Sequence, residues 1–291
     1  DEKISDDFYK RLEIDYQNSV KVLNENKFFK KSPWWIKCSD EFKKIFLNEN
    51  LKLNIEALNN FRNSVKTKAA ILADQNFLSS NNSSFINKLK SLSIINLYHK
   101  LSEHVDLDIL RMCSESRAGN SFCVSYRNQR LSHRVLRYAY YVSQIKKNTS
   151  LDLKAQNLFL DIGGGYAGLS RYLKNIYNHS TFVTVELPEV CVLAAYFLKK
   201  CFPNKKIATF SDFKDHKKIN SEDLREFDFV ILPQPMIEKF DNEIFDICIN
   251  TTSLGEMTNE MQQFYINEIE RISKKFFYSV NRPKERIEKF N

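Results

Sequence analysis

Apolar residues recur at intervals of three and four through much of the first hundred positions. The pattern is clear in "FYKRLEIDYQNSVKVL" (residues 8–23) and again in "FINKLKSLSIINLYHKL" (residues 85–101). This spacing gathers apolar side chains on one face of a helix. No glycine occurs before Gly119, and polar breaks such as "SSNNSS" (residues 79–84) separate the runs. The sequence therefore predicts a helical N-terminal cap region over residues 1–115.

The pattern changes to alternating strands and helices in the second half of the chain. A helix is predicted over "SHRVLRYAYYVSQIKK", and short apolar runs typical of buried strands follow from Asn157 onward. The expected strands are "LFLDI", "TFVTVE", "FDFVIL", "FDICIN" and "KFFYSV", with "KIATF" as a further short candidate. Helices are expected from Leu169, over "VCVLAAYFLKKCF" and over "EMQQFYINEIERISK". Residues 116–291 are therefore expected to form an α/β domain, a parallel sheet with helices on both faces and ligands at the carboxyl ends of the strands.

Composition narrows the class of protein. Of the 291 residues, 43% are apolar and 27% are charged, which is typical of a soluble globular protein. No apolar run is long enough to span a membrane, and the start "DEKISDDFYK" lacks the apolar centre of a secretory signal. The six cysteines are scattered, with no CxxC pair and no histidine at metal-ligand spacing. We therefore expect a cytoplasmic protein without a disulfide framework, and we predict no metal ligands.

The net charge of +8 is weak evidence for nucleic-acid binding, because lysine is frequent throughout the chain. A nucleic-acid site is better indicated by basic residues with interleaved aromatic residues on one stripe. The stretch "KFFKKSPWWIK" (residues 27–37) comes nearest to this pattern. We interpret Phe28, Phe29, Trp34 and Trp35 as packing residues and the lysines as solvated.

The most informative stretch is "FLDIGGGYAG" (residues 159–168), which holds four of the six glycines and includes the first predicted strand. Gly163, Gly165 and Gly168 satisfy G-x-G-x-x-G, the pattern in which backbone amides and a helix N-terminus approach the pyrophosphate of a dinucleotide. Asp161, Gly163 and Gly165 also fit the acid-x-G-x-G pattern of S-adenosylmethionine-dependent methyltransferases. The loop therefore predicts a nucleoside cofactor, which is either a dinucleotide or S-adenosylmethionine.

Electrostatics separates these choices. A carboxylate at the carboxyl tip of the first strand would repel a pyrophosphate, whereas S-adenosylmethionine carries an ammonium and a sulfonium group. Asp161 therefore favours S-adenosylmethionine, with a turn acid bound by local amides as the alternative role. Glu186 ends the second predicted strand about 25 residues later. An acid there can accept ribose hydroxyls in either class of enzyme.

Several further stretches resemble one family. "FLDIGGGYAG", "VELPE", "FVILPQP" and especially "FDICINTTSLGEM", followed by a helix and "FFYSVNRP", are similar to the sugar O-methyltransferases of bacterial polysaccharide and glycosylated natural-product pathways. The resemblance covers roughly residues 114–283. The glycine motif is shared by all class I methyltransferases, whereas "NTTSLGEM" is much more particular. The resemblance implies a Rossmann-like class I methyltransferase sheet and an enzyme that transfers a methyl group from S-adenosylmethionine to a sugar hydroxyl, leaving S-adenosylhomocysteine, for example in capsular polysaccharide biosynthesis.

The resemblance also implies which residues line the cofactor. They are Asp161, Gly163, Gly164, Gly165 and Glu186, with Gln234 beside the adenine, and Asn250 and Ser253 at the tip of the fourth strand toward the methionyl part and the acceptor. Ala167 replaces the third glycine of the usual methyltransferase turn, and we expect it to allow the same close approach. The fold normally adds an antiparallel hairpin after its fifth strand. We see no counterpart up to "KERIEKFN", so part of the acceptor wall is expected to be missing.

Methyl transfer to a hydroxyl is an in-line displacement that needs an aligned acceptor oxygen and a group that removes its proton. Glu256 is the first candidate base because it follows the tip of the fourth strand, with Gly255 allowing a sharp turn. Its alternative role is to stabilise the next helix through the helix dipole. His133 is the second candidate because a neutral imidazole has a suitable pKa, although a lone histidine on a helix is more often structural. A divalent metal could assist, but no ligand set indicates one.

Arg117 and Arg127 lie in the connection between the two predicted regions. Arginine can clamp the diphosphate of a nucleotide-activated sugar, and a solvent-facing role is the alternative. The expected partner is a small-molecule sugar or nucleotide sugar, with no nucleic acid and no membrane span, and a homo-oligomer is compatible with the sequence. Two other functions stay open: an NAD-dependent oxidoreductase acting on a nucleotide sugar, and an RNA-binding protein on a methyltransferase scaffold.

Overall fold

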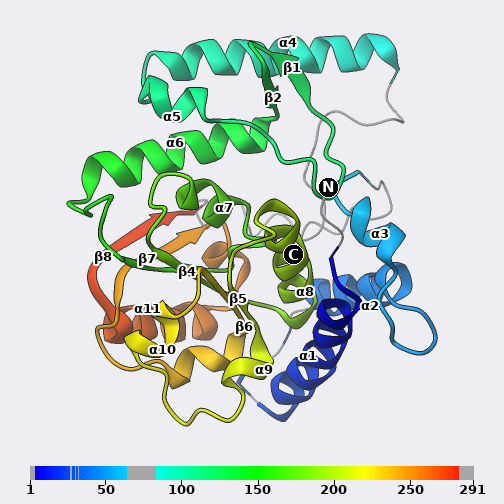
Figure 1. Cartoon of the computed structure of the whole chain (residues 1–291), viewed down its shortest axis with the longest axis vertical. Coiled ribbons are helices and arrows are strands. Elements are labelled where there is room, and N and C mark those ends of the chain that lie inside the picture. Colours follow the sequence, from blue (N-terminus) through cyan, green and yellow to red (C-terminus); the bar gives the residue numbers. More distant parts are fainter. Residues whose placement is uncertain (1–3, 27, 30, 32, 64–82, 282–291) are drawn as a thin grey trace. The chain divides into compact units, whose positions relative to one another are not determined.

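The computed structural model of the chain describes residues 4–26, 28–29, 31, 33–63 and 83–281 (Figure 1). Contacts divide the chain into two units. The sheet unit comprises Asp1–Lys37 and Leu151–Asn291, and the helical unit comprises Cys38–Ser150. The boundary expected between residues 115 and 116 lies inside the helical unit. The two units are described separately below.

The sheet unit is built on six strands that pair in parallel, in the order β5-β6-β4-β3-β7-β8. They are β3 (Leu158–Ile162), β4 (Thr181–Glu186), β5 (Ile207–Ala208), β6 (Phe229–Pro233), β7 (Phe245–Thr251) and β8 (Ser273–Val280). Every residue of β3, β4 and β6 is buried, as expected for parallel strands covered on both faces. The predicted α/β fold is confirmed, and "KIATF" supplies the short edge strand β5.

The helices of this unit cover both faces of the sheet. They are α7 (Gly168–Lys174), α8 (Pro188–Cys201), α9 (Phe210–Phe213), α10 (Ser221–Arg225) and α11 (Asn259–Ile272), with the 3₁₀ segments η1 (Gln234–Lys239) and η2 (Leu254–Glu256). The chain steps from β3 to β4 through α7, from β4 to the edge strand β5 through α8, and back to β6 through α9 and α10. It then returns past β3 to β7 and steps to β8 through α11. Right-handed crossovers in opposite directions place these helices on opposite faces. The direction of the chain reverses at β3, so ligands are expected at the carboxyl end of this strand.

The first helix, α1 (Asp6–Glu25), belongs to the sheet unit rather than to the helical region where the sequence pattern places it. It packs beside α8 and α9 (Figure 1). Its Asp15 is buried, accepts a hydrogen bond of 2.9 Å from the Ser211 amide, and also accepts from the hydroxyls of Thr209 and Ser211. A buried carboxylate at the start of α9 favours this docking because it satisfies amide and hydroxyl donors there.

The basic and aromatic stretch at residues 27–37 packs against the same unit. Phe29 is buried, and its ring lies 5.2 Å from that of Phe264, which confirms a packing role for this aromatic residue. Lys31, expected to be solvated, instead pairs with buried Glu189 at 2.7 Å between Nζ and Oε1. Residues 27, 30 and 32 and the side chain of Trp34 lie outside the described residues.

The helical unit contains the helices and the hairpin of residues 38–150. They are the larger part of α2 (Pro33–Phe46), then α3 (Ile55–Asn59), α4 (Ser84–Ser102), α5 (Leu107–Arg111), β1 (Val124–Tyr126), β2 (Gln129–Leu131) and α6 (His133–Asn148). The long helices α4 and α6 contact each other, and α5 contacts both. Helix α6 buries Leu136, Ala139, Val142 and Ile145, which recur at helical spacing. This apolar face explains why residues 116–150 join the N-terminal helices rather than the sheet.

A buried ion pair ties three segments of the helical unit together. The Arg62 guanidinium lies 2.7 Å from the Glu115 carboxylate, and both side chains are almost fully buried. Ser132, the N-cap of α6, donates to the other oxygen of Glu115 at 2.5 Å.

Among the described residues, no helix is long and apolar enough to cross a membrane.

We predict that replacing Glu115 by alanine destabilises the protein by about 3–5 kcal/mol, because it removes the carboxylate that pairs with the buried Arg62 guanidinium. Urea unfolding followed by circular dichroism measures the change. The matched control is Asp40→Ala, which removes the exposed Asp40–Lys43 pair and is expected to cost less than about 1 kcal/mol. Equal losses in the two variants would contradict the role given to the buried pair.

Candidate active site

The glycine loop between β3 and α7 lies at the carboxyl end of the sheet, where the chain reverses direction. Gly163 has a φ of +68° and its amide donates to the Val185 carbonyl at 3.0 Å. A Cβ built on Gly163 would lie 2.1 Å from Ser253 Oγ, so a side chain is excluded there. Gly165 has a φ of +60°, and a Cβ at this position would meet no atom within 4 Å. The loop is thus tightly packed on one side at Gly163 and open at Gly165.

Asp161 lies beneath this loop. Its side chain is buried, and a Cβ on Gly164 would lie 2.5 Å from Asp161 Oδ2. Neither carboxylate oxygen has a hydrogen-bond partner in the described part of the chain. The sequence analysis places this acid at the carboxyl tip of the first strand. It is the fourth residue of β3, and its buried carboxylate lies close to the loop backbone at Gly164.

Glu186 ends β4 beside the loop. One of its oxygens accepts from the Gly165 amide at 2.9 Å, and the other accepts from the Leu187 amide at 2.8 Å. The side chain is buried but each carboxylate oxygen has a second lone pair, so the group can accept further hydrogen bonds. Glu186 therefore fixes the loop at Gly165 and keeps capacity for a ligand.

Burial raises the pKa of both acids. The pKa of Asp161 rises to about 7, mainly because burial disfavours its charged form and also because Glu186 is nearby. The pKa of Glu186 also rises to about 7 through burial; its two amide hydrogen bonds act against this, and the charges of Glu256 and Glu189 add to it. The loop therefore rests on two interacting acids whose ionisation is unfavourable unless positive charge is brought close.

The tip of β7 is locked to the tip of β3. The Asn250 amide group donates to the Ile162 carbonyl at 2.8 Å and to Ser253 Oγ at 2.6 Å, and its oxygen accepts from the Leu254 amide and from the Asn281 side chain. These four bonds use its whole hydrogen-bonding capacity. Asn250 and Ser253 therefore hold the loop in place, and the contact with the cofactor that the resemblance implies stays a prediction.

Asn281 was not singled out by the sequence analysis. Its Nδ2 donates to Asn250 Oδ1 at 2.9 Å, and its Oδ1 accepts from the Gly255 amide at 3.4 Å. The signal that points to it is its position directly after β8, because the carboxyl ends of neighbouring parallel strands meet at one edge.

The sharp turn after β7 is made by Thr252 rather than by Gly255. Thr252 has a φ of +67°, whereas Gly255 is not among the residues with positive φ. A β-branched residue rarely adopts this conformation, and such strain concentrates at functional sites. The turn leads into η2, where Glu256 is exposed, and the charge of Glu256 raises the pKa of Glu186. The first candidate base thus lies on the glycine-loop side of the sheet.

Gln234 directly follows β6, in which Pro233 pairs with Glu186. Its side chain is half-buried at the same edge of the sheet.

The predicted cofactor residues and the first candidate base therefore lie at the carboxyl edge of one sheet. They are Asp161, the glycine loop, Glu186, Gln234, Asn250, Ser253 and Glu256. Among the described residues, no group of three or more His, Cys, Asp or Glu side chains is arranged to hold a metal ion.

No protein-family model matches this chain, and no curated protein matches it. Among solved structures, "PigF with SAH" is 14% identical with a TM-score of 0.33, covering 72% of this chain and 53% of that one. "Coclaurine N-Methyltransferase (CNMT) bound to N-methylheliamine and SAH" is 12% identical with a TM-score of 0.33, covering 94% and 62%. "MtNAS in complex with MTA and tNA" is 12% identical with a TM-score of 0.28, covering 90% and 80%. This chain thus spans about half of the PigF chain, and its fold is assigned from strand order and burial alone.

The remaining predicted site residues belong to the helical unit. His133 begins α6, is half-buried, and lies 3.3 Å from Ser93 Oγ through Nε2; burial and the Arg137 charge lower its pKa. Arg117 is exposed in a turn. Arg127 has a φ of +48° at the tip of the β1–β2 hairpin, and its guanidinium lies 5.4 Å from the centre of the Tyr126 ring. Their roles stay predictions.

We predict that the acid pair makes the protein less stable as the pH rises. The folded-state pKa values, about 7, lie above the ordinary values of 3.8 and 4.5. The folded protein keeps both acids protonated over a wider pH range than the unfolded chain does. Their contribution to the free energy of unfolding is therefore complete below about pH 4 and is lost as the pH rises to about 7. Asp161→Asn should remove part of this dependence, on the order of 2 kcal/mol between pH 4.5 and pH 8.

Urea unfolding of both proteins at these two pH values measures the difference. Asp228→Asn is the matched control because the pKa of Asp228, an acid paired with lysines, is lowered. Identical pH dependence in the wild type and Asp161→Asn would show that Asp161 titrates as an ordinary exposed acid.

Proposed function

We propose that this protein is an S-adenosylmethionine-dependent methyltransferase that acts on a sugar hydroxyl, in a nucleotide-activated sugar or a surface-polysaccharide intermediate. The observation that supports the cofactor is the Asp161 carboxylate, which is buried under the glycine loop and receives no hydrogen bond from the described residues. The observation that suggests the acceptor is the "NTTSLGEM" stretch, which resembles sugar O-methyltransferases.

The two acids under the loop favour a cation over a phosphate. Two like charges 4 Å apart repel by about 4 kcal/mol at the effective dielectric constant of a protein surface. A pyrophosphate above Asp161 and Glu186 would add negative charge to a site whose pKa values are already raised. An ammonium or sulfonium group relieves this repulsion and favours the ionised acids. The same argument disfavours an NAD-dependent oxidoreductase.

The loop residues fit a nucleoside ligand. Gly165 has open space where a side chain would stand, so a ligand can approach its backbone closely. Glu186 can accept ribose hydroxyls on lone pairs not used by the Gly165 and Leu187 amides. Gln234, half-buried directly after β6, is the residue proposed to flank the adenine base. Asn250 and Ser253 position the loop through the Ile162 carbonyl.

In the proposed reaction the cofactor supplies the methyl group, and the protein orients the acceptor and removes its proton. When bound, S-adenosylmethionine supplies a methyl group on a positively charged sulfur. Glu256 is exposed on η2 and is the proposed base that takes the proton from the acceptor hydroxyl. The strained turn at Thr252 and the hydrogen bonds of Asn250 and Asn281 orient the segment that carries Glu256.

We predict that Gly165→Ala separates folding from cofactor binding. An alanine at φ +60° with no steric clash should cost about 1 kcal/mol of stability, whereas its methyl group would fill the space proposed for the cofactor. Calorimetry should show S-adenosylhomocysteine binding to the wild type and at least about tenfold weaker binding to the variant.

NADH is the control ligand in the same titrations. A wild-type protein that binds NADH and not S-adenosylhomocysteine would replace the proposed function with the oxidoreductase. Unchanged affinity in a folded Gly165→Ala variant would remove the loop from the cofactor site.

We predict that the protein adds one methyl group to a member of a nucleotide-sugar panel in the presence of S-adenosylmethionine, detected by mass spectrometry as a gain of one methylene. Glu256→Gln should lower the turnover by roughly 10²–10⁴-fold, the usual contribution of a general base, without changing affinity for S-adenosylhomocysteine. His133→Ala tests the second candidate in the same assay. A large loss in His133→Ala with full activity in Glu256→Gln would transfer the role of base to His133.

A further inference from the structure

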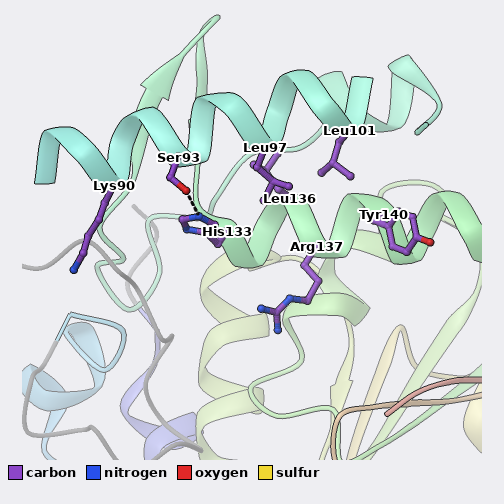
Figure 2. A pocket seen from close by; sticks show the side chains of 8 residues that line it. All are labelled: Lys90, Ser93, Leu97, Leu101, His133, Leu136, Arg137 and Tyr140. Atoms are coloured by element: carbon purple, nitrogen blue, oxygen red, sulfur yellow. Dashed lines mark hydrogen bonds between the residues drawn. The ribbon is translucent and has the colours of Figure 1, made fainter. Parts of the chain in front are cut away.

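The helical unit contains a groove between α4 and α6, and His133, the second candidate base, is one of its lining residues (Figure 2). Its volume is about 500 Å³, which is within the range of small-molecule sites. Helix α4 contributes Lys90, Ser93, Leu97 and Leu101, and helix α6 contributes His133, Leu136, Arg137 and Tyr140.

The groove has an apolar part and a basic part. Leu97, Leu101, Leu136 and Tyr140 form the apolar part, and Figure 2 shows three of them, the leucines, gathered between the two helices. Leu136 is buried, whereas Leu97, Leu101 and Tyr140 are partly exposed to water, which is unfavourable for apolar surface. An apolar group that enters this part of the groove is therefore stabilised there.

The basic part contains two cations. Lys90 and Arg137 line the groove, and neither has an ion pair with a described residue. In the view of Figure 2 their side chains extend to the same side, with His133 between them. Burial, and after it the charge of Arg137, lowers the pKa of His133. Two cations beside an apolar surface suit a ligand with a doubly charged anionic end, and arginine binds phosphate oxygens in a bidentate way.

We propose that this groove binds a phosphorylated amphiphile, with its apolar chain between α4 and α6 and its phosphate against Lys90 and Arg137. All the residues that line the groove belong to the helical unit. It would accept an alkyl or prenyl phosphate.

The test uses octyl phosphate below its micelle concentration, with 1-octanol and inorganic phosphate as the two separate halves of the ligand. Calorimetry on the full chain, without S-adenosylmethionine, should show octyl phosphate binding at least about tenfold more tightly than either half. A Lys90→Gln/Arg137→Gln double variant should lose about tenfold or more of this affinity. Tyr140→Ala should weaken octyl phosphate and leave inorganic phosphate unchanged.

The matched control is Lys88→Gln/Lys100→Gln, which removes two exposed cations of α4 that do not line the groove. It should bind octyl phosphate like the wild type. Equal losses in the two double variants, or octyl phosphate binding no tighter than inorganic phosphate, would overturn the proposal.

Vesicles of phosphatidylglycerol test a membrane surface as the alternative partner, since α4 also exposes Phe85, Leu89 and Leu92. Co-sedimentation that depends equally on all four cations, without binding of monomeric octyl phosphate, would assign α4 to membranes and overturn the groove as a ligand site. Binding of S-adenosylhomocysteine is measured separately, so failure of one proposal leaves the other intact.

Discussion

The buried carboxylate of Asp161 is the constraint on which the candidate site depends. It lies so close beneath the loop that Gly164 has no room for a side chain, and it receives no hydrogen bond from the described residues. Leaving a buried polar group unsatisfied costs about 1–3 kcal/mol, and more when it is charged. No hydrogen bond from the described residues offsets this cost in the folded protein. The arrangement becomes favourable when a cation is bound nearby, and this is the physical basis for the proposed cofactor.

The hydrogen bonds around Asn250 show how the protein holds the loop over that charge. They join the last residue of β3, the turn after β7 and the residue after β8, so three strand ends are fixed relative to one another. Two non-glycine residues have left-handed backbone in the adjoining segments, Ala167 at the start of α7 and Thr252 in the turn after β7. Such residues persist only where their surroundings determine the backbone. The site is therefore built in advance of any ligand, and cofactor binding does not have to organise it.

The strands of the sheet could be predicted because their signal is local. "LFLDI", "TFVTVE" and "FDICIN" are apolar runs between turn residues, and a buried parallel strand requires little more. The glycine loop was predictable for the same reason. The burial of the Asp161 side chain could not be predicted from the sequence. It depends on β4 and β7, the strands on either side of β3, and β7 in particular is distant along the chain.

Long-range pairing accounts for the other differences. Asp15 meets Ser211 across 196 positions and Lys31 meets Glu189 across 158, so a local pattern could not place α1 or residues 27–37 on the sheet unit. The turn after β7 was assigned to Gly255 from residue preference, whereas tertiary contacts force Thr252 into the left-handed conformation. The resemblance implied that Asn250 faces the ligand, and only the three-dimensional structure shows that its hydrogen bonds also support the loop.

The acids at this edge of the sheet also differ in what they can do. Asp161 and Glu186 are buried, and their raised pKa values make them sensitive to charge but poorly placed to exchange protons with water. Glu256 is exposed and close enough to affect Glu186 electrostatically. A group that removes a proton in each turnover must also release it to solvent, which only an accessible carboxylate does readily. Carboxylates in different environments take different roles, so the same edge can hold a cation with its buried acids and accept a proton with its exposed one.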